Sequence, residues 1–233
     1  MIETRRKRRP GTVVVAGPRA PKQILDPQIW RQGRAKIAEA ALGLFLRYGY
    51  HATPVRAIAQ AAGISSGSVF NYFSGKEEIL ELVLDDSQRQ AEASLDAAQK
   101  ALAVSRDVTD PVELFVRVYR HYAESIDSIR RYTLLAYQEA KSLAPKSRTP
   151  LFDRERRIAS LLQAAAEPAI RAGLFGSDAL DLKVQSLIVL AHAWAVRHWA
   201  WSQYPTIADY LDDLQKVAVA MMREGGSASR DSR

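Results

Sequence analysis

Apolar residues recur with the period of an α-helix along almost the whole chain from residue 29 onward. In the first such stretch, spacings of one, three and four residues place the apolar side chains on one helix face that ends near Gly49. The residues on this face are Ile37, Ala41, Leu44, Phe45 and Tyr48. We find no convincing strand pattern, so we expect an all-α protein.

Capping and terminating residues divide the N-terminal part into four helices. Thr53 followed by Pro54 predicts the start of a short second helix, which should end at Gly63 in a left-handed conformation. A third helix is expected over residues 65–73. The segment Ser74-Gly75-Lys76-Glu77 then has the form of a capping box, which opens a long fourth helix.

Five longer helices are expected in the C-terminal half, separated by proline and glycine. They cover about residues 110–125, 129–143, 151–172, 178–203 and 206–223, with a loop at 145–150. Residues 1–28 contain four prolines and lack apolar periodicity, so we expect a disordered basic arm there. Residues 225–233 should form a disordered polar tail.

The charge of the chain is unevenly distributed. The 233 residues carry 33 basic and 26 acidic side chains, a formal charge of +7. Residues 1–28 contain seven basic and two acidic residues, and residues 29–76 contain six basic residues and one acidic residue. The remaining residues therefore carry a net charge of −3. A basic end on an acidic body is typical of a protein that binds a polyanion, with nucleic acid as the first candidate.

Several classes of protein are disfavoured by composition. The chain has no cysteine, which excludes disulfide scaffolds, thiolate metal sites and cysteine nucleophiles and fits a reducing compartment. The longest uncharged apolar run, residues 184–196, is too short for a membrane span, and no signal peptide is evident. The four histidines lack ligand spacing, so we expect neither a metal site nor a cofactor. We therefore expect a soluble cytoplasmic protein.

Residues 54–73 have the pattern of a helix-turn-helix, with a tight turn between two short helices. Val69 and Phe73 lie four positions apart and should face the preceding helices. The outer surface should then carry small polar residues that allow close approach to base edges and phosphates. This surface consists of Ser66, Gly67, Ser68, Phe70 and Asn71, with Tyr72 at its edge. Gly63 to Gly67 also matches a G-x-S-x-G nucleophile elbow, but that motif requires a preceding strand, so we expect no enzyme.

The anchored residues of this region resemble one family. The matching positions are Ala40-Ala41, Leu44-Phe45, Gly49-Tyr50, Thr53, Ile58-Ala59, Ala62 to Ser65, Gly67-Ser68, Tyr72-Phe73, Lys76-Glu77 and Leu80. Residues 31–90 are thereby similar to the DNA-binding domain of the TetR family of bacterial transcriptional regulators. The resemblance implies a helix-turn-helix head over residues 29–76. A long helix would join it to an effector-binding and dimerisation domain over residues 77–224.

The resemblance also implies roles for individual residues. Thr53 would cap the second helix and touch phosphate, and Asn71, Tyr72 and Lys76 would contact phosphates or base edges. The recognition helix would begin with Ser65, Ser66, Gly67 and Ser68. Phe70 stands where a tyrosine is usual, so it either touches a thymine methyl or only packs. Arg34 completes the expected DNA-contact set.

The C-terminal half is expected to form a homodimer and to bind an effector. In the family the last two helices pair between subunits, which points to residues 178–203 and 206–223. The dimer would be a repressor that binds a pseudo-palindromic operator in double-stranded DNA. A small lipophilic or acyl-CoA-like effector would release it from this operator. The residues expected to line the effector-binding site are Phe115, Tyr119, Tyr122, Tyr137, Phe152, His192 and Trp199. Packing in the core would also explain the presence of these side chains. A DNA-bound scaffold that acts through a protein partner, without an effector, is the alternative.

Overall fold

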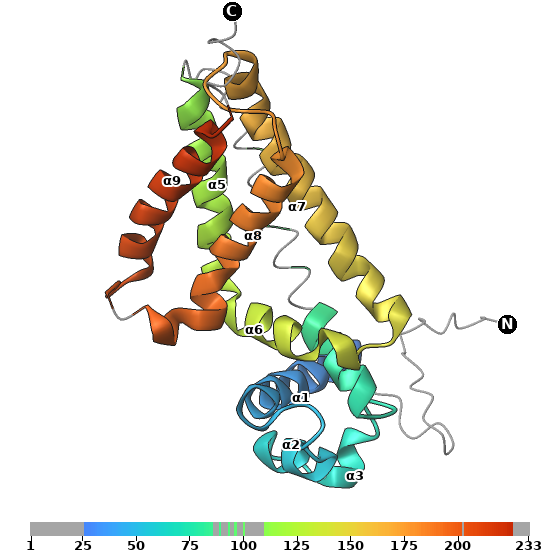
Figure 1. Ribbon diagram of the computed structural model, residues 1–233. Coiled ribbons are helices and arrows are strands. Elements are labelled where there is room, and N and C mark those ends of the chain that lie inside the picture. The colour runs from blue at the N-terminus through green and yellow to red at the C-terminus, as the bar shows by residue number, and fades with distance from the viewer. Residues whose placement is uncertain are drawn as a thin grey trace, which may run out of the picture. The chain divides into compact units, whose positions relative to one another are not determined.

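The computed structural model describes residues 26–85, 110–201 and 203–225, together with positions 89, 93, 96 and 100. All regular structure in these residues is helical, which confirms the predicted all-α class (Figure 1). The chain divides after Leu84 into two compact units. The expected arm, up to residue 25, and the expected tail, from residue 226, lie outside the described residues.

The N-terminal unit contains α1 (Pro27–Tyr48), α2 (Val55–Ala61), α3 (Ser66–Val69) and a helix that begins at residue 76. Helix α1 begins two residues earlier than the apolar pattern predicted. The reason is local: the Asp26 carboxylate accepts a hydrogen bond from the Gln28 N–H at 2.7 Å. Pro27 has no N–H to satisfy and suits the first helical position.

The core of this unit draws on all four helices. Its largest fully buried side chains are Ile37, Leu42, Phe45, Ile58, Ile79 and Leu80. Val83 and Leu84 are buried as well, so the helix that begins at residue 76 contributes an apolar face over its first turns. The unit therefore ends after Leu84, eight residues beyond the boundary at residue 76 that we expected from the motifs.

The C-terminal unit is a bundle of five α-helices with two short 3₁₀ turns, η2 (Ala140–Ser142) and η3 (His198–Ala200), in its described part. The helices are α5 (Pro111–Ser128), α6 (Arg130–Glu139), α7 (Pro145–Arg171), α8 (Leu180–Arg197) and α9 (Ile207–Arg223). Helix α5 packs against α7, α8 and α9, and α6 packs against α8 (Figure 1). Aromatic and aliphatic residues from α5, α7, α8 and α9 form one continuous core.

The predicted loop at residues 145–150 is wrong, because α7 begins at Pro145 and includes Pro150 and Pro168. A proline inside a helix removes one hydrogen bond and ordinarily ends the helix. Here the apolar face of α7 is buried along its length, from Leu151 to Ala169. This packing against the bundle offsets the loss of single hydrogen bonds.

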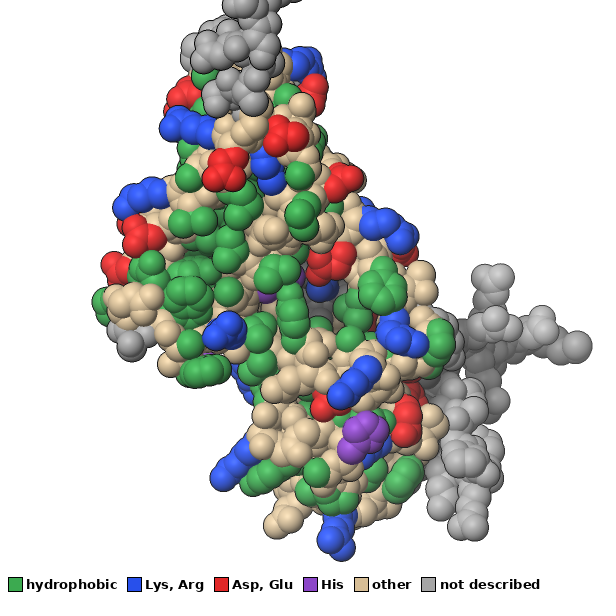
Figure 2. Space-filling view, in the orientation of Figure 1, with side chains coloured by type: hydrophobic (Ala, Val, Ile, Leu, Met, Phe, Trp, Pro, Cys, Tyr) green, Lys and Arg blue, Asp and Glu red, His purple; other side chains and the backbone are tan. Residues whose placement is uncertain are grey.

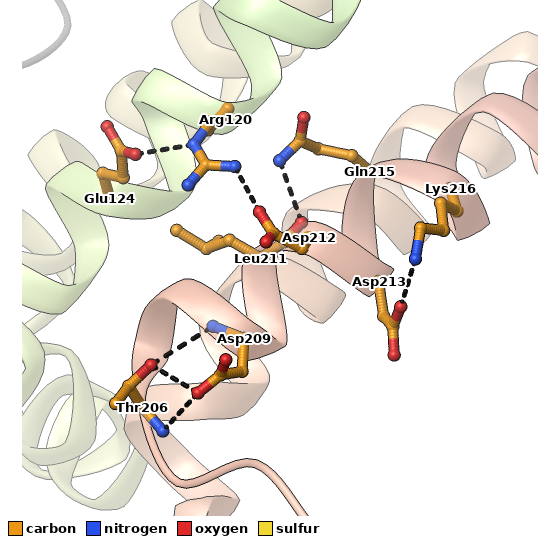
Figure 3. A network of polar contacts seen from close by, with 9 residues as sticks. All are labelled: Arg120, Glu124, Thr206, Asp209, Leu211, Asp212, Asp213, Gln215 and Lys216. Carbon is orange, nitrogen blue, oxygen red and sulfur yellow. Dashed lines mark hydrogen bonds and ion pairs between the residues drawn. The ribbon is translucent and has the colours of Figure 1, made fainter.

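Helix α9 begins close to the predicted residue 206 and is anchored there by a capping box. The Thr206 hydroxyl and N–H both donate to the Asp209 carboxylate, and the Asp209 N–H donates back to the hydroxyl (Figure 3). Arg120 of α5 pairs with Glu124 on its own helix and with Asp212 of α9, each at 2.8 Å. The Arg120–Asp212 ion pair thus joins the first turns of α9 to α5.

Across the described residues, none of the helices combines the length and the apolar composition that a membrane crossing requires.

Candidate nucleic-acid interface and buried polar cluster

The outward surface of α3 is formed by small polar side chains. Ser65 caps the helix, because its Oγ accepts a hydrogen bond from the Ser68 N–H at 3.1 Å, and the two hydroxyls lie 2.8 Å apart. Ser66 and Gly67 are exposed, and a Cβ added to Gly67 would meet nothing closer than Ser65 Oγ at 3.9 Å. Phe70 exposes 48% of its surface just after the helix. This surface is open to close approach by a second molecule.

Tyr72 is held at the edge of this surface by a glycine that the motifs did not single out. Helix α3 ends at Val69, four residues before the expected end, and residues 70–72 form turns. In this conformation the Tyr72 ring lies on Gly33 of α1: a Cβ added there would be 2.4 Å from Tyr72 Cε1. An isolated glycine inside a helical pattern was the available signal, since only a small residue permits such an approach.

Arg34 faces the interior of the N-terminal unit. Its Nη1 donates to the Tyr72 carbonyl and to the Glu78 carboxylate, each at 2.6 Å. The guanidinium also lies 4.2 Å from the Phe73 ring centroid and 4.7 Å from that of Trp30. Arg34 therefore connects α1 to the segment that follows α3 through Nη1, and its expected role as a direct DNA contact stays a prediction.

Lys76 and Thr53 are also occupied within the unit. Lys76 Nζ donates to the carbonyl oxygens of Tyr50, His51 and Thr53 at 2.8, 3.2 and 3.1 Å, which uses all three of its donors. Thr53 is buried, and its hydroxyl donates to the Gly49 carbonyl at 2.8 Å. Thr53 thus caps the end of α1 and not the start of α2, whose N-cap is Pro54. Both residues hold the loop between α1 and α2.

The expected capping box at Ser74 uses a different glutamate. Glu78 accepts hydrogen bonds from the Ser74 N–H and hydroxyl at 2.7 and 3.0 Å, whereas Glu77 accepts one from the Tyr50 hydroxyl at 3.0 Å. The helix begins at residue 76, one residue later than the predicted capping box implied. The third helical position, whose side chain bonds back to Ser74, is therefore Glu78 and not Glu77. Burial raises the pKa of Glu78, but the hydrogen bonds from Ser74 and Arg34 outweigh it and lower that pKa.

Three of the expected effector-binding residues meet inside the C-terminal unit. His192 of α8 is buried, with Nε2 2.7 Å from the Tyr122 hydroxyl and Nδ1 2.9 Å from the Tyr137 hydroxyl. Burial, with a smaller contribution from the charge of Arg154, lowers the pKa of His192 to about 4. Figure 2 shows a hollow among α6, α7 and α8, where histidine, basic and acidic side chains lie side by side. A neutral histidine therefore joins two tyrosines from α5 and α6.

The other four expected residues do not join this cluster. Phe115 and Tyr119 are fully buried in the core, where Phe115 packs edge-on against Phe175 and the Tyr119 hydroxyl donates to the Leu187 carbonyl at 2.8 Å. Phe152 and Trp199 are exposed. Aromatic spacing alone could not separate core residues from residues that line a site, since both occur at helical intervals.

The N-terminal unit matches a known family model, and longer relatives match most of the chain. Residues 37–83 match the model of the bacterial regulatory proteins of the tetR family. The transcriptional regulator HbdR of Aromatoleum sp. strain CIB is 29% identical over 190 residues, which cover 82% of this chain and 80% of HbdR. The chain therefore contains a DNA-binding domain of the TetR type over residues 37–83. The family is one of DNA-binding transcriptional regulators.

Other members of the family extend the similarity. The transcriptional repressor KstR2 of Rhodococcus jostii is 29% identical over 171 residues, covering 71% of this chain and 78% of KstR2. A tetR-family regulatory protein from Rhodococcus RHA1 shares the fold with a TM-score of 0.71 at 20% identity, covering 82% and 97% of the two chains. AibR, whose structure was solved in complex with isovaleryl coenzyme A and operator DNA, shares the fold with a TM-score of 0.57 at 17% identity. The similarity covers 82% of this chain and 98% of AibR.

Two basic residues outside the expected set lie on the surface of the N-terminal, TetR-type unit. Lys36 of α1 and Arg56 of α2 are exposed, and neither has an ion-pair partner within the described ranges. Lys36 Nζ lies next to the helix-turn-helix corner, 3.8 Å from a Cβ added at Gly63. The net basic charge of residues 29–76 was the available signal, but it could not distinguish these side chains from Arg34 and Lys76.

The last two helices of the chain, α8 and α9, also expose apolar side chains. Leu182 and Val189 of α8 lie seven positions apart and expose 68% and 57% of their surfaces, and Val217 of α9 exposes 48%. Residues seven apart lie on the same helix face. This exposed set, which we call the α8–α9 face, lies on the two helices that the family resemblance indicated.

Proposed function

We propose that the protein is a homodimeric transcriptional repressor that is released from its operator by a small effector. The exposed surface of α3 carries this proposal, because it combines small polar side chains with an open backbone beside Gly67. Such a surface suits insertion into the major groove, where side chains read base edges. The similarity to KstR2, a transcriptional repressor, supports repression over activation.

We assign direct DNA contacts to the residues that are accessible in the N-terminal unit. Base edges and nearby phosphates would meet Ser65, Ser66, Gly67, Ser68, Phe70, Asn71 and Tyr72. The phosphate contacts come from Lys36 and Arg56, whose charges are available. Arg34, Thr53 and Lys76 act indirectly, by holding the recognition segment and the loop before α2.

Dimerisation is assigned to the α8–α9 face. Three exposed branched aliphatic side chains on two packed helices are costly to leave in water, and a second copy of the same face would cover them. A dimer with twofold symmetry would present two α3 helices to successive major grooves about 34 Å apart. The operator is therefore expected to be a pseudo-palindrome.

The effector is assigned to the buried cluster of Tyr122, Tyr137 and His192. An effector changes DNA affinity only through its different affinities for the two states of the regulator. The fold shared with AibR, which was solved in complex with isovaleryl coenzyme A and operator DNA, supports an acyl-CoA-like effector. A scaffold without an effector would not need a neutral histidine bridging two tyrosines beside a hollow.

The test is titration of the purified protein against genomic fragments at several salt concentrations. A preferred pseudo-palindromic fragment, with binding that weakens steeply as salt increases, is expected. Weak binding that shows no preferred fragment at any salt concentration would reject the repressor assignment.

A further inference from the structure

Arg154 of α7 places a positive charge beside the Tyr122–His192–Tyr137 cluster. Its charge acts on both Tyr122 and His192, which come from α5 and α8. Its Nη1 is buried and has no hydrogen-bond partner in the described part of the chain. A buried guanidinium donor without a partner destabilises a folded protein, and a bound ligand that accepts a hydrogen bond would supply the missing partner.

The hydrogen-bond directions within the cluster leave a second free donor. A neutral imidazole has one N–H and one acceptor nitrogen. Tyr122 is buried, and its only described partner is His192, so its hydroxyl is satisfied by donating to Nε2. Nδ1 then carries the hydrogen and donates to the Tyr137 oxygen at 2.9 Å. The hydroxyl hydrogen of Tyr137, whose side chain is half exposed, remains available.

The surroundings of these donors are apolar. Three of the four polar residues have a buried isoleucine four positions away on their own helix: Ile126 follows Tyr122, Ile158 follows Arg154, and Ile188 precedes His192. The neighbouring Glu155 carboxyl is itself partly buried, and burial raises its pKa. A ligand here must therefore be largely apolar and must bring a hydrogen-bond acceptor.

We propose that Arg154 and Tyr137 bind the acyl oxygen of an effector whose chain is apolar. This assignment deepens the proposed function, on which it rests, by naming the recognition residues and the ligand class. Both a thioester and a free carboxylate present such an oxygen. Arg154 Nη1 and the Tyr137 hydroxyl would donate to it, and the isoleucines would surround the first part of the chain.

The test compares octanoyl-coenzyme A with octanoate on the full-length protein by calorimetric titration, with octan-1-ol as the ligand without an acyl oxygen. Tighter binding of one acyl compound than of octan-1-ol is expected, and the stronger of the two identifies the source of the oxygen. Arg154→Met should weaken that binding about tenfold or more, and Tyr137→Phe by about threefold to tenfold. Arg171→Gln, on the same helix but exposed and paired with Glu167, should bind like the original protein.

Thermal unfolding without ligand separates recognition from structural support. If Arg154 only supported the fold, Arg154→Met would lower the melting temperature, whereas removal of an unsatisfied buried donor should leave it unchanged or raise it. Failure of both acyl compounds to bind the original protein would overturn the assignment. Release of operator by the ligand to the same extent from Arg154→Met and the original protein would also overturn it, while the proposed function would stand. Arg154-dependent binding that leaves operator affinity unchanged would support the site and reject the effector response.

Discussion

The ring of Tyr72 lies directly on Gly33 of α1, and a Cβ at that position would come within 2.4 Å of Tyr72 Cε1. Alanine is intrinsically better than glycine in a helix by about 0.5–1 kcal/mol. The contact with Tyr72 opposes that gain, because the ring must move away from α1. The position of Tyr72, which we propose as a DNA contact, therefore depends on the absence of a side chain 39 positions earlier in the sequence.

Replacing Gly33 with alanine is expected to weaken operator binding by about tenfold, because the displaced Tyr72 leaves the edge of the recognition surface. Tyr72→Phe, which keeps the ring, should have a smaller effect. Fluorescence anisotropy with labelled operator measures both variants. An operator affinity unchanged in Gly33→Ala would show that the ring of Tyr72 does not contribute.

Gly67→Ala provides the matched comparison, since the added methyl group meets nothing closer than Ser65 Oγ at 3.9 Å. The melting temperature should stay the same or rise slightly, because alanine favours the helix. Operator affinity should fall by about tenfold, because the methyl group occupies the space needed for close approach. A melting temperature that falls together with affinity would instead indicate a structural role.

Lys76 and Lys36 are expected to respond differently to the same substitution. Lys76→Met removes one hydrogen-bond donor from each of three carbonyl oxygens and should lower the free energy of unfolding by about 1–2 kcal/mol. Lys36→Met should leave stability unchanged and reduce the slope of log affinity against log salt by about one. Urea unfolding and operator titration at several salt concentrations measure the two effects. A reduced salt slope in Lys76→Met, at unchanged stability, would contradict the internal role of Lys76.

Acid should destabilise the C-terminal unit through His192. Its pKa is about 4 in the folded protein against an ordinary value of 6.5, so the unfolded chain binds the proton more tightly. The stability associated with neutral His192 is then present above pH 6.5 and is lost as the pH falls towards 4, by up to about 3 kcal/mol. The groups around it are Tyr122, Tyr137, Arg154 and Glu155.

His192→Gln should reduce this acid sensitivity. Glu155, whose pKa is raised by burial, acts in the opposite direction, since its neutral form is favoured in the folded state. The informative quantity is therefore the difference between the two proteins in melting temperature from pH 7 to pH 5. Parallel melting curves across that range would mean that His192 does not stay neutral in the folded state.

A charge on the α8–α9 face should prevent dimerisation. Val189→Asp places a carboxylate among the exposed aliphatic side chains, which would have to be desolvated in a dimer. Sedimentation velocity is expected to show a dimer for the original protein and a monomer for this variant. Leu174→Asp, an exposed leucine outside both helices, is the control and should remain dimeric. A dimeric Val189→Asp would place the interface elsewhere.

Sequence reasoning succeeded where the cause lies within a few residues. The turn at Gly63, with a φ of 66°, and the capping of α9 by Thr206 and Asp209 both follow from neighbouring positions. The end of α3 and the start of α7 were wrong. In both places the packing of the surrounding unit decides how far the helix continues, and local residue preferences are too weak to do so.

The sequence by itself determined the all-helical class, the helix-turn-helix and the family, because apolar periodicity and turn residues act over short distances along the chain. Only the tertiary structure decided which polar groups are available. Arg34 and Lys76 were expected to contact DNA, yet carbonyl and carboxylate oxygens more than twenty residues away accept hydrogen bonds from Arg34 Nη1 and Lys76 Nζ. The same long-range packing brings Tyr122, Tyr137 and His192 together and leaves Arg154 Nη1 without a partner in the described part of the chain. Whether a charged or polar group is free to bind depends on such distant contacts, which no short sequence pattern specifies.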